Sequence, residues 1–159
     1  MIYAILYVLS VVLVNLAFSF VPLLQLPGGE FWSPVSLIVG FTFVVRDYAQ
    51  REIGHWVLPA MLLGGLVSGI MADATVAIAS VCAFMVGEFL DWAVYTFSGK
   101  PFSQRILLSS TLSTPVDSTV FLAMVGIFSV PGVLFMTAGK MVGAVIVYFL
   151  ARRREALPA

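Results

Sequence analysis

Residues 74–97, ATVAIASVCAFMVGEFLDWAVYTF, decide the fold class of this chain. The stretch is apolar over more than the ~20 residues that a transmembrane helix needs. It nevertheless contains Glu88 and Asp91, which lie three positions apart and therefore share one face of a helix. A carboxylate inside an apolar segment is costly unless it is paired or used. The stretch therefore predicts a transmembrane helix whose two carboxylates are paired or take part in function.

The composition of the whole chain is that of an integral membrane protein. Of its 159 residues, 61% are hydrophobic and only 10% are charged, against roughly 25% charged residues in soluble domains. The mean hydropathy is +1.08. The formal net charge is zero, so no basic face suggests nucleic acid. The single cysteine excludes an internal disulfide, and the single histidine has no nearby His or Cys with which to bind a metal.

Six apolar spans are predicted, and they form one membrane domain that covers residues 1–159. The first span has no basic segment before it and no clear cleavage site, so we expect it to be retained rather than removed as a signal peptide. A short echo between SPV at Ser33 and TPV at Thr114 leaves a 3+3 inverted repeat open. The predicted spans are 2–24, 31–46, 56–72, 74–97, 106–128 and 131–150.

The basic residues predict the orientation. With six spans both termini lie on one side, and the joints and tail on that side hold seven Lys and Arg residues, whereas the other joints hold none. By the positive-inside rule this side is cytoplasmic, in the cell membrane or a bacterial inner membrane. The seven residues are Arg46, Arg51, Lys100, Arg105, Arg152, Arg153 and Arg154.

Polar side chains gather near mid-depth in the predicted spans. They are Asn15, Glu88, Asp117 and Lys140, with Asp91 one turn further toward the cytoplasm. Each ionisable group costs about 2.5–3.5 kcal/mol at a helix centre. One interpretation is a salt-bridge cluster that only joins helices. The other is a ligand site, because the three acids exceed the one lysine by two charges.

A hydroxyl-rich stretch, residues 108–118 (LSSTLSTPVDS), has two interpretations as well. It is either a cavity wall in a helix that contains Pro115, or a cytoplasmic loop that runs to Thr114 before a short helix. The sequence contains no HExxH, GxSxG or phosphate-binding loop. Acids within the membrane without a nucleophile and base favour transport over catalysis, so we expect no enzyme activity and no cofactor.

Three blocks resemble the vitamin uptake transporter family, also called the queuosine precursor transporter family. The blocks are GFTFVVRDYAQREIG (40–54), ASVCAFMVGEFLDWAVYTF (79–97) and RILLSSTLSTPVDSTVFLAMVGIF (105–128). Together with VNLA (14–17) they cover most of the chain. The resemblance implies import of 7-deazaguanine bases such as preQ0 and preQ1. It also implies a six-helix fold like the substrate-binding subunits of energy-coupling-factor vitamin transporters.

The resemblance also implies a set of substrate-binding residues. Glu88, where the family often has Gln, is expected to accept the ring N–H and exocyclic amine of a guanine-like edge. Flat aromatic side chains are candidates to stack on the base, namely Phe84, Phe89, Trp92 and Phe121. The family's polar positions fall on Asn15, Asp47, Glu88, Asp91, Arg105, Ser113, Asp117 and Ser118, and the mid-span Lys140 joins them as a charge partner.

Three functions remain open at this point. The first is a stand-alone base transporter, whose partners are a small-molecule base and the lipid bilayer. The second is a substrate-binding subunit, for this or another vitamin or base, that needs a separate ATP-driven partner, since the chain has no nucleotide-binding motif. The third is a structural membrane protein whose acids only pair helices. A homodimer is also left open.

Overall fold

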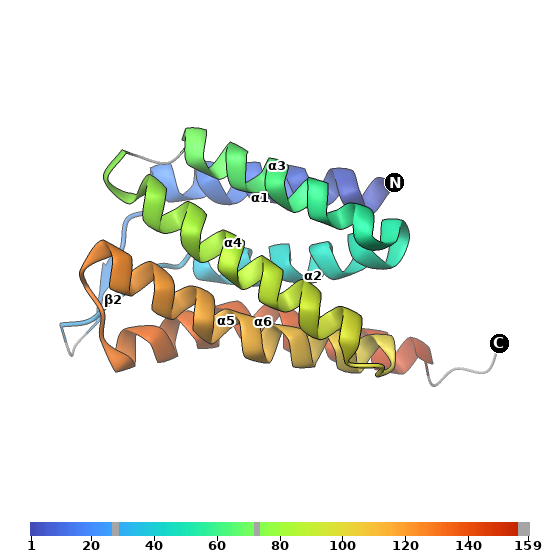
Figure 1. Cartoon of the computed structure of the whole chain (residues 1–159). Coiled ribbons are helices and arrows are strands. Elements are labelled where there is room, and N and C mark those ends of the chain that lie inside the picture. Colours follow the sequence, from blue (N-terminus) through green and yellow to red (C-terminus); the bar gives the residue numbers. More distant parts are fainter. Residues whose placement is uncertain (27–28, 72–73, 156–159) are drawn as a thin grey trace.

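Helices make up nearly all of the protein (Figure 1). The computed structural model describes residues 1–26, 29–71 and 74–155. One short hairpin, β1 (Leu24–Gln25) paired with β2 (Phe31–Trp32), follows the first helix. The helices are α1 (Ile2–Phe20), α2 (Ser36–Ile53), the 3-10 turn η1 (Gly54–Trp56), α3 (Val57–Met71), α4 (Ala74–Phe97), α5 (Phe102–Val125) and α6 (Val130–Glu155).

The six α-helices form a closed ring in which each packs against two neighbours. The order around the ring is α1, α2, α6, α5, α4, α3 and back to α1. Helix α2 additionally contacts α3, α4 and α5, so it touches every other α-helix of the bundle. Figure 1 shows successive helices running in opposite directions, so that the start of α1 and the end of α6 lie at the same end of the bundle.

The apolar core has two parts, and α2 contributes to both. One cluster joins α1, α2 and α3 through Tyr7, Ala49 and Met61, which are at most 1% exposed. The other joins α2, α5 and α6 through Val44, Ile106 and Ala144. Helix α2 also contains buried polar residues, among them Arg46, Asp47 and Gln50.

The outside of the bundle is apolar, as expected for contact with lipid. Large side chains such as Leu9, Ile70 and Leu134 are more than half exposed. Within the described residues, five stretches are long and apolar enough to cross a membrane, with mean hydropathy from 1.2 to 2.2. One of them, Ser36–Met71, contains α2, η1 and α3 together. The α-helical membrane fold is thus confirmed, whereas six crossings stay a prediction.

Helix α2 differs from the predicted span 31–46 and corrects the assignment of Arg46 to a loop. The helix runs on to Ile53, and Arg46 is fully buried in it. Thr42, Arg46 and Gln50 follow one another at helical spacing and are all buried. The prediction ended the span at the first charged residue, but the ends of a helix depend on its buried partners as much as on hydropathy. The predicted first span also extends too far, since α1 ends at Phe20.

The hydroxyl-rich stretch 108–118 belongs to α5, so the predicted alternative of a loop to Thr114 is wrong. Pro115 lies inside this continuous helix. Thr114 donates its hydroxyl to the Ser110 carbonyl at 2.8 Å, as hydroxyls near a helix proline often do. The SPV triplet precedes α2 while TPV lies in the middle of α5. The echo between them therefore gives no support to a 3+3 repeat.

Small residues bring α2 and α6 into close contact. A Cβ on Gly40 would overlap the backbone carbonyl of Lys140, and one on Gly143 would lie 2.9 Å from the Gly40 carbonyl carbon. Gly139 faces the Ser36 side chain in the same way. This close contact between α2 and α6 fixes the position of Lys140 along the axis of the bundle.

Candidate functional site

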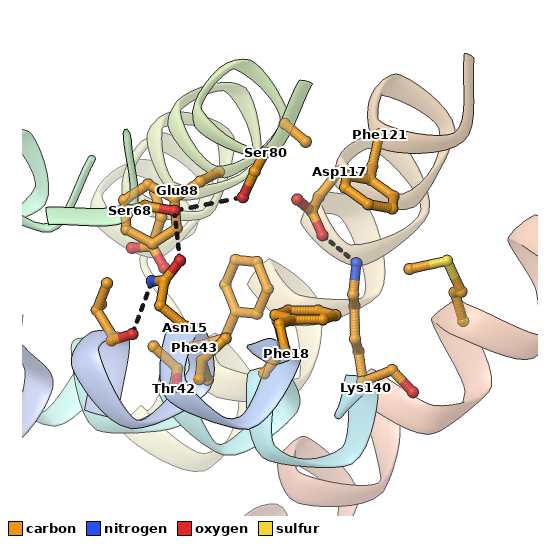
Figure 2. A pocket seen from close by; sticks show the side chains of 17 residues that line it. Asn15, Phe18, Thr42, Phe43, Ser68, Ser80, Glu88, Asp117, Phe121 and Lys140 are labelled. Carbon is orange, nitrogen blue, oxygen red and sulfur yellow. Dashed lines mark hydrogen bonds and ion pairs between the residues drawn. The ribbon is translucent and has the colours of Figure 1, made fainter. Parts of the chain in front are cut away.

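A cavity lies inside the bundle, and all six α-helices contribute to its wall (Figure 2). Its volume is about 70 Å³, enough for more than one water molecule. Polar groups converge on it from Asn15 of α1, Ser68 of α3, Glu88 of α4, Asp117 of α5 and Lys140 of α6. A concave site at the meeting point of helices, with few polar groups on apolar walls, is typical of small-molecule binding.

Glu88 supplies the acceptor side of the cavity. Its side chain is 1% exposed, and its Oε2 atom accepts a hydrogen bond from the Tyr7 hydroxyl at 3.0 Å. The same oxygen lies 3.3 Å from Arg46 Nε. Oε1 has no hydrogen-bond partner among the residues that the structure describes. A buried carboxylate oxygen without a donor is costly, and this one belongs to a residue of the cavity wall.

A chain of neutral hydrogen bonds forms a second part of the wall. Asn15 donates from Nδ2 to the Val11 carbonyl at 2.8 Å and accepts at Oδ1 from Ser68 Oγ at 3.2 Å. Ser68 and Ser80 share a further hydrogen bond of 3.3 Å. These contacts, drawn in Figure 2, hold the Asn15 amide in one orientation. The amide thus joins α1 to α3 at the edge of the cavity.

An ion pair forms the opposite side. Lys140 donates to Asp117 Oδ2, and also to Ser118 Oγ at 3.0 Å. The ammonium group is a donor of three hydrogen bonds, and these are the two that the described residues accept. Gly87 of α4 makes room for this pair, because a Cβ there would lie 2.7 Å from Asp117 Cβ. Lys140 therefore faces the cavity with donor capacity to spare.

Four phenylalanine rings contribute to the apolar part of the wall. Phe18, Phe43, Phe84 and Phe121 all line the cavity, and the view in Figure 2 places Phe18 and Phe43 between the Asn15 side and the Lys140 side. Flat apolar walls with polar groups at the two ends suit a planar heterocycle whose edges carry donors and acceptors.

A second group of buried charges adjoins the cavity through Glu88. We call it the Arg46 cluster, and it consists of Arg46, Asp47, Glu88 and Asp91. Arg46 Nη1 lies 3.2 Å from Asp47 Oδ1, Nη2 donates to Asp91, and Nε lies beside Glu88. All four side chains are at most 1% exposed. The guanidinium group thus connects α2 to α4 deep inside the bundle.

Neutral side chains surround the Arg46 cluster. Gln50 accepts from Arg46 and donates to Thr96 Oγ1 at 2.8 Å. From α5, Ser109 donates to Asp47 and Ser113 donates to Asp91, each at 3.4 Å. The hydroxyl-rich stretch of α5 therefore faces the carboxylates.

The buried charges do not balance. The cavity and the Arg46 cluster together contain four carboxylates and two cations, all of them buried. If every group is ionised, a formal excess of two negative charges remains inside the bundle. An unpaired charge in a low-dielectric interior is expensive, so protons or a bound cation must compensate for the excess.

Most of the predicted site residues come together here. The cavity wall contains Asn15, Glu88, Asp117, Lys140, Phe84 and Phe121. The remaining members of the group contact these residues or the Arg46 cluster, namely Asp47, Asp91, Ser113 and Ser118.

Three predicted residues lie elsewhere. Arg105 is partly exposed near the start of α5, where its Nε donates to the Lys100 carbonyl at 2.6 Å and its guanidinium lies over the Tyr95 ring. Phe89 is 56% exposed on the outer surface. Trp92 is partly buried against the apolar cluster of α1, α2 and α3, beside Phe89 and His55, and is not one of the residues that line the cavity. The sequence could not distinguish Phe89 and Trp92 from the aromatic residues that line the cavity, because side chains a few positions apart lie on different faces of a helix.

Three residues of the site are not expected from the sequence, namely Tyr7, and Arg46 and Gln50, which the predicted spans leave in a loop. A signal for two of them was present, since Thr42, Arg46 and Gln50 form a polar stripe with a spacing of four. Tyr7 gave no such signal, because a single tyrosine in an apolar span usually marks an interface.

Comparisons with known proteins identify no family for this chain, so its class is inferred from its fold and its site. Among residues 1–26, 29–71 and 74–155, no group of three His, Cys, Asp or Glu side chains is placed to hold a metal ion. A scan against models of protein families gave no match, and neither did searches of curated proteins and of solved structures. The fold and the site define an α-helical, multi-pass membrane protein with a charged cavity in its interior.

Proposed function

We propose that this chain is a membrane transporter that imports 7-deazaguanine bases, the precursors of queuosine. The observation that carries the proposal is Glu88 Oε1, a buried acceptor without a donor on the wall of an aromatic-lined cavity. The N–H groups of a guanine-like edge would supply that donor in a charge-assisted hydrogen bond. Oε2 is already engaged with Tyr7 and Arg46, so recognition falls on Oε1.

The opposite side of the cavity complements the rest of such a base. The ring carbonyl would accept the spare N–H of Lys140, and the Asn15 amide would contact the ring edge. The aminomethyl group of preQ1 is a cation, and Asp117 is the carboxylate placed to meet it. The four phenylalanine rings supply faces on which a planar base can stack.

The topology that we propose has six crossings with both termini in the cytoplasm. Helices α2 and α3 are one continuous apolar stretch interrupted by η1, and Figure 1 shows the chain turning back there. The exposed cations Arg51, Lys100 and Arg152 lie in the last turn of α2, the α4–α5 turn and the last turn of α6. Their common end of the bundle matches the positive-inside rule.

The test is binding by the purified full-length chain in lipid nanodiscs. We expect saturable binding of preQ1, preQ0 or guanine and none of adenine, whose ring nitrogen is an acceptor where guanine has a donor. Glu30→Gln is the matched control for Glu88→Gln, since Glu30 contacts Ser129 at one end of the bundle and is no part of the cavity wall. Failure of every base to bind would reject this function and favour a structural role for the charges.

Uptake separates the two modes of transport. We expect accumulation of labelled preQ1 in a host without a related ATP-driven partner. Binding without uptake in that host would instead make the chain the substrate-binding subunit of a larger transporter.

A further inference from the structure

The Arg46 cluster contains more negative charge than its cation can balance. One guanidinium group faces Asp47, Glu88 and Asp91, and none of these side chains is more than 1% exposed. The Lys140–Asp117 pair is already balanced by itself. The excess of two negative charges therefore belongs to the Arg46 cluster, and protons are the only counter-charges that need no further space.

Glu88 is the member of the cluster through which such a proton can exchange. It lines the cavity, and its Oε1 is a fully buried oxygen without a hydrogen-bond partner among the described residues. Asp47 and Asp91 instead receive hydroxyl donors from α5 and are not part of the cavity wall. A proton on Oε1 would belong to a residue of the cavity wall and would not be held by another described side chain, so water or a ligand can take its place.

Charged and titratable side chains face Glu88 from most of the neighbouring helices. Tyr7 faces it from α1, Arg46 and Asp47 from α2, and Asp91 from its own helix. Helix α5 adds Asp117 and α6 adds Lys140 across the cavity, whereas α3 contains no titratable residue. The nearest groups thus include one strong cation and two further acids, so a neutral Glu88 lowers the repulsion within the cluster.

We propose that the Arg46 cluster is a proton-exchange site linked to the cavity, and that the cavity prefers cationic heterocycles. While the cavity is empty, Glu88 holds a proton on Oε1. When the ligand binds, the O–H bond breaks, the proton passes to water, and the carboxylate accepts an N–H of the ligand. A monocationic ligand replaces the charge of the proton, so the total charge inside the bundle does not change. The inference rests on the proposed function and extends it to the class of ligand.

A comparison of two ligands of nearly the same shape distinguishes the effect of ligand charge on affinity from the effect of ligand shape. preQ1 carries an ammonium group, whereas preQ0 carries a neutral nitrile on the same ring system. Exchange of a proton for preQ1 conserves the buried charge, but exchange for preQ0 adds one negative charge. We therefore expect preQ1 to bind at least tenfold more tightly than preQ0 and to release more protons.

The experiment is isothermal titration calorimetry of the full-length chain with preQ1 at one pH in phosphate and in Tris, which differ in their heat of protonation. We expect heats that differ between the buffers by the amount for about one released proton. Affinity should rise with pH by about tenfold per unit while the site is protonated, the slope of one linked proton. In Glu88→Gln the buffer dependence should vanish, and Glu30→Gln should behave as the unmodified protein.

Infrared difference spectra supply a second readout that needs no variant. Addition of preQ1 should remove the C=O band of a protonated carboxylic acid. Binding of preQ1 with equal heats in both buffers across the pH range, and with no loss of this band, would overturn the exchange but leave the transporter proposal standing. Absence of binding by any base would overturn both.

Discussion

Replacing Glu88 by Gln is the most direct test of the candidate site. The change preserves the size of the side chain and leaves an amide oxygen that can still accept from the Tyr7 hydroxyl, now at 3.0 Å from Oε2. The amide nitrogen then occupies the position of Oε1 on the cavity wall. Because that nitrogen is a donor, it faces the donors of a guanine-like edge.

The expected loss follows from these contacts. One charge-assisted hydrogen bond contributes about 1.5–3 kcal/mol, so the dissociation constant for preQ1 should increase by about tenfold to a hundredfold. The fold should survive, because Gln is neutral, as the protonated Glu88 of the empty cavity is, and therefore adds no negative charge near Arg46. Thermal unfolding in detergent should therefore occur at or above the temperature of the unmodified protein.

The assay is equilibrium binding of preQ1, preQ0 and guanine to Glu88→Gln, with Glu30→Gln as the matched control. A milder loss with a changed order of ligands would still support contact with the base. Unchanged affinity for all three ligands would show that Glu88 is structural and that the site is misassigned.

Further predictions concern the charges, the packing and the orientation. Lys140→Met leaves Asp117 buried without its cation, which should lower the free energy of unfolding by about 3–5 kcal/mol and reduce the yield of folded protein. Normal yield and uptake would refute the pairing. Lys140→Arg should be partly tolerated. Arg46→Met should prevent folding, and recovery of the fold by the further change Asp91→Asn, measured by size-exclusion chromatography, would identify the partner. Gly40→Ala should cost about 1–3 kcal/mol, because its methyl group overlaps the Lys140 carbonyl; an unchanged melting temperature would contradict the close contact. A reporter fused to the C-terminus should be active in the cytoplasm, and periplasmic activity would reject the six-crossing topology.

Hydropathy was sufficient to predict a helical membrane protein, and the depth of the polar residues predicted part of the site. Glu88, Asp117 and Lys140 occupy similar depths in consecutive spans, so antiparallel packing alone brings them close together. Arg46 could not be placed by the same reasoning, because the cost of a buried cation is decided by Asp91, a partner 45 positions away. The outward direction of Phe89, and the position of Trp92 outside the cavity wall, depend on the rotation of α4, which its nearly uniform apolar sequence leaves undetermined.

The position of Arg46 in α2 has a consequence for biosynthesis. A helix with Arg46 and Asp47 near its middle is a poor candidate for insertion by itself, since an arginine there costs about 2.5–3.5 kcal/mol. Its counter-charges on α4 are synthesised only after α3 is complete. The second helix must therefore wait at the membrane interface or within the insertion machinery until the fourth arrives. Chains that stop before α4 would present Arg46 with Asp47 as its one acidic partner of the cluster and without Glu88 and Asp91, which gives quality-control proteases a means to recognise incomplete molecules.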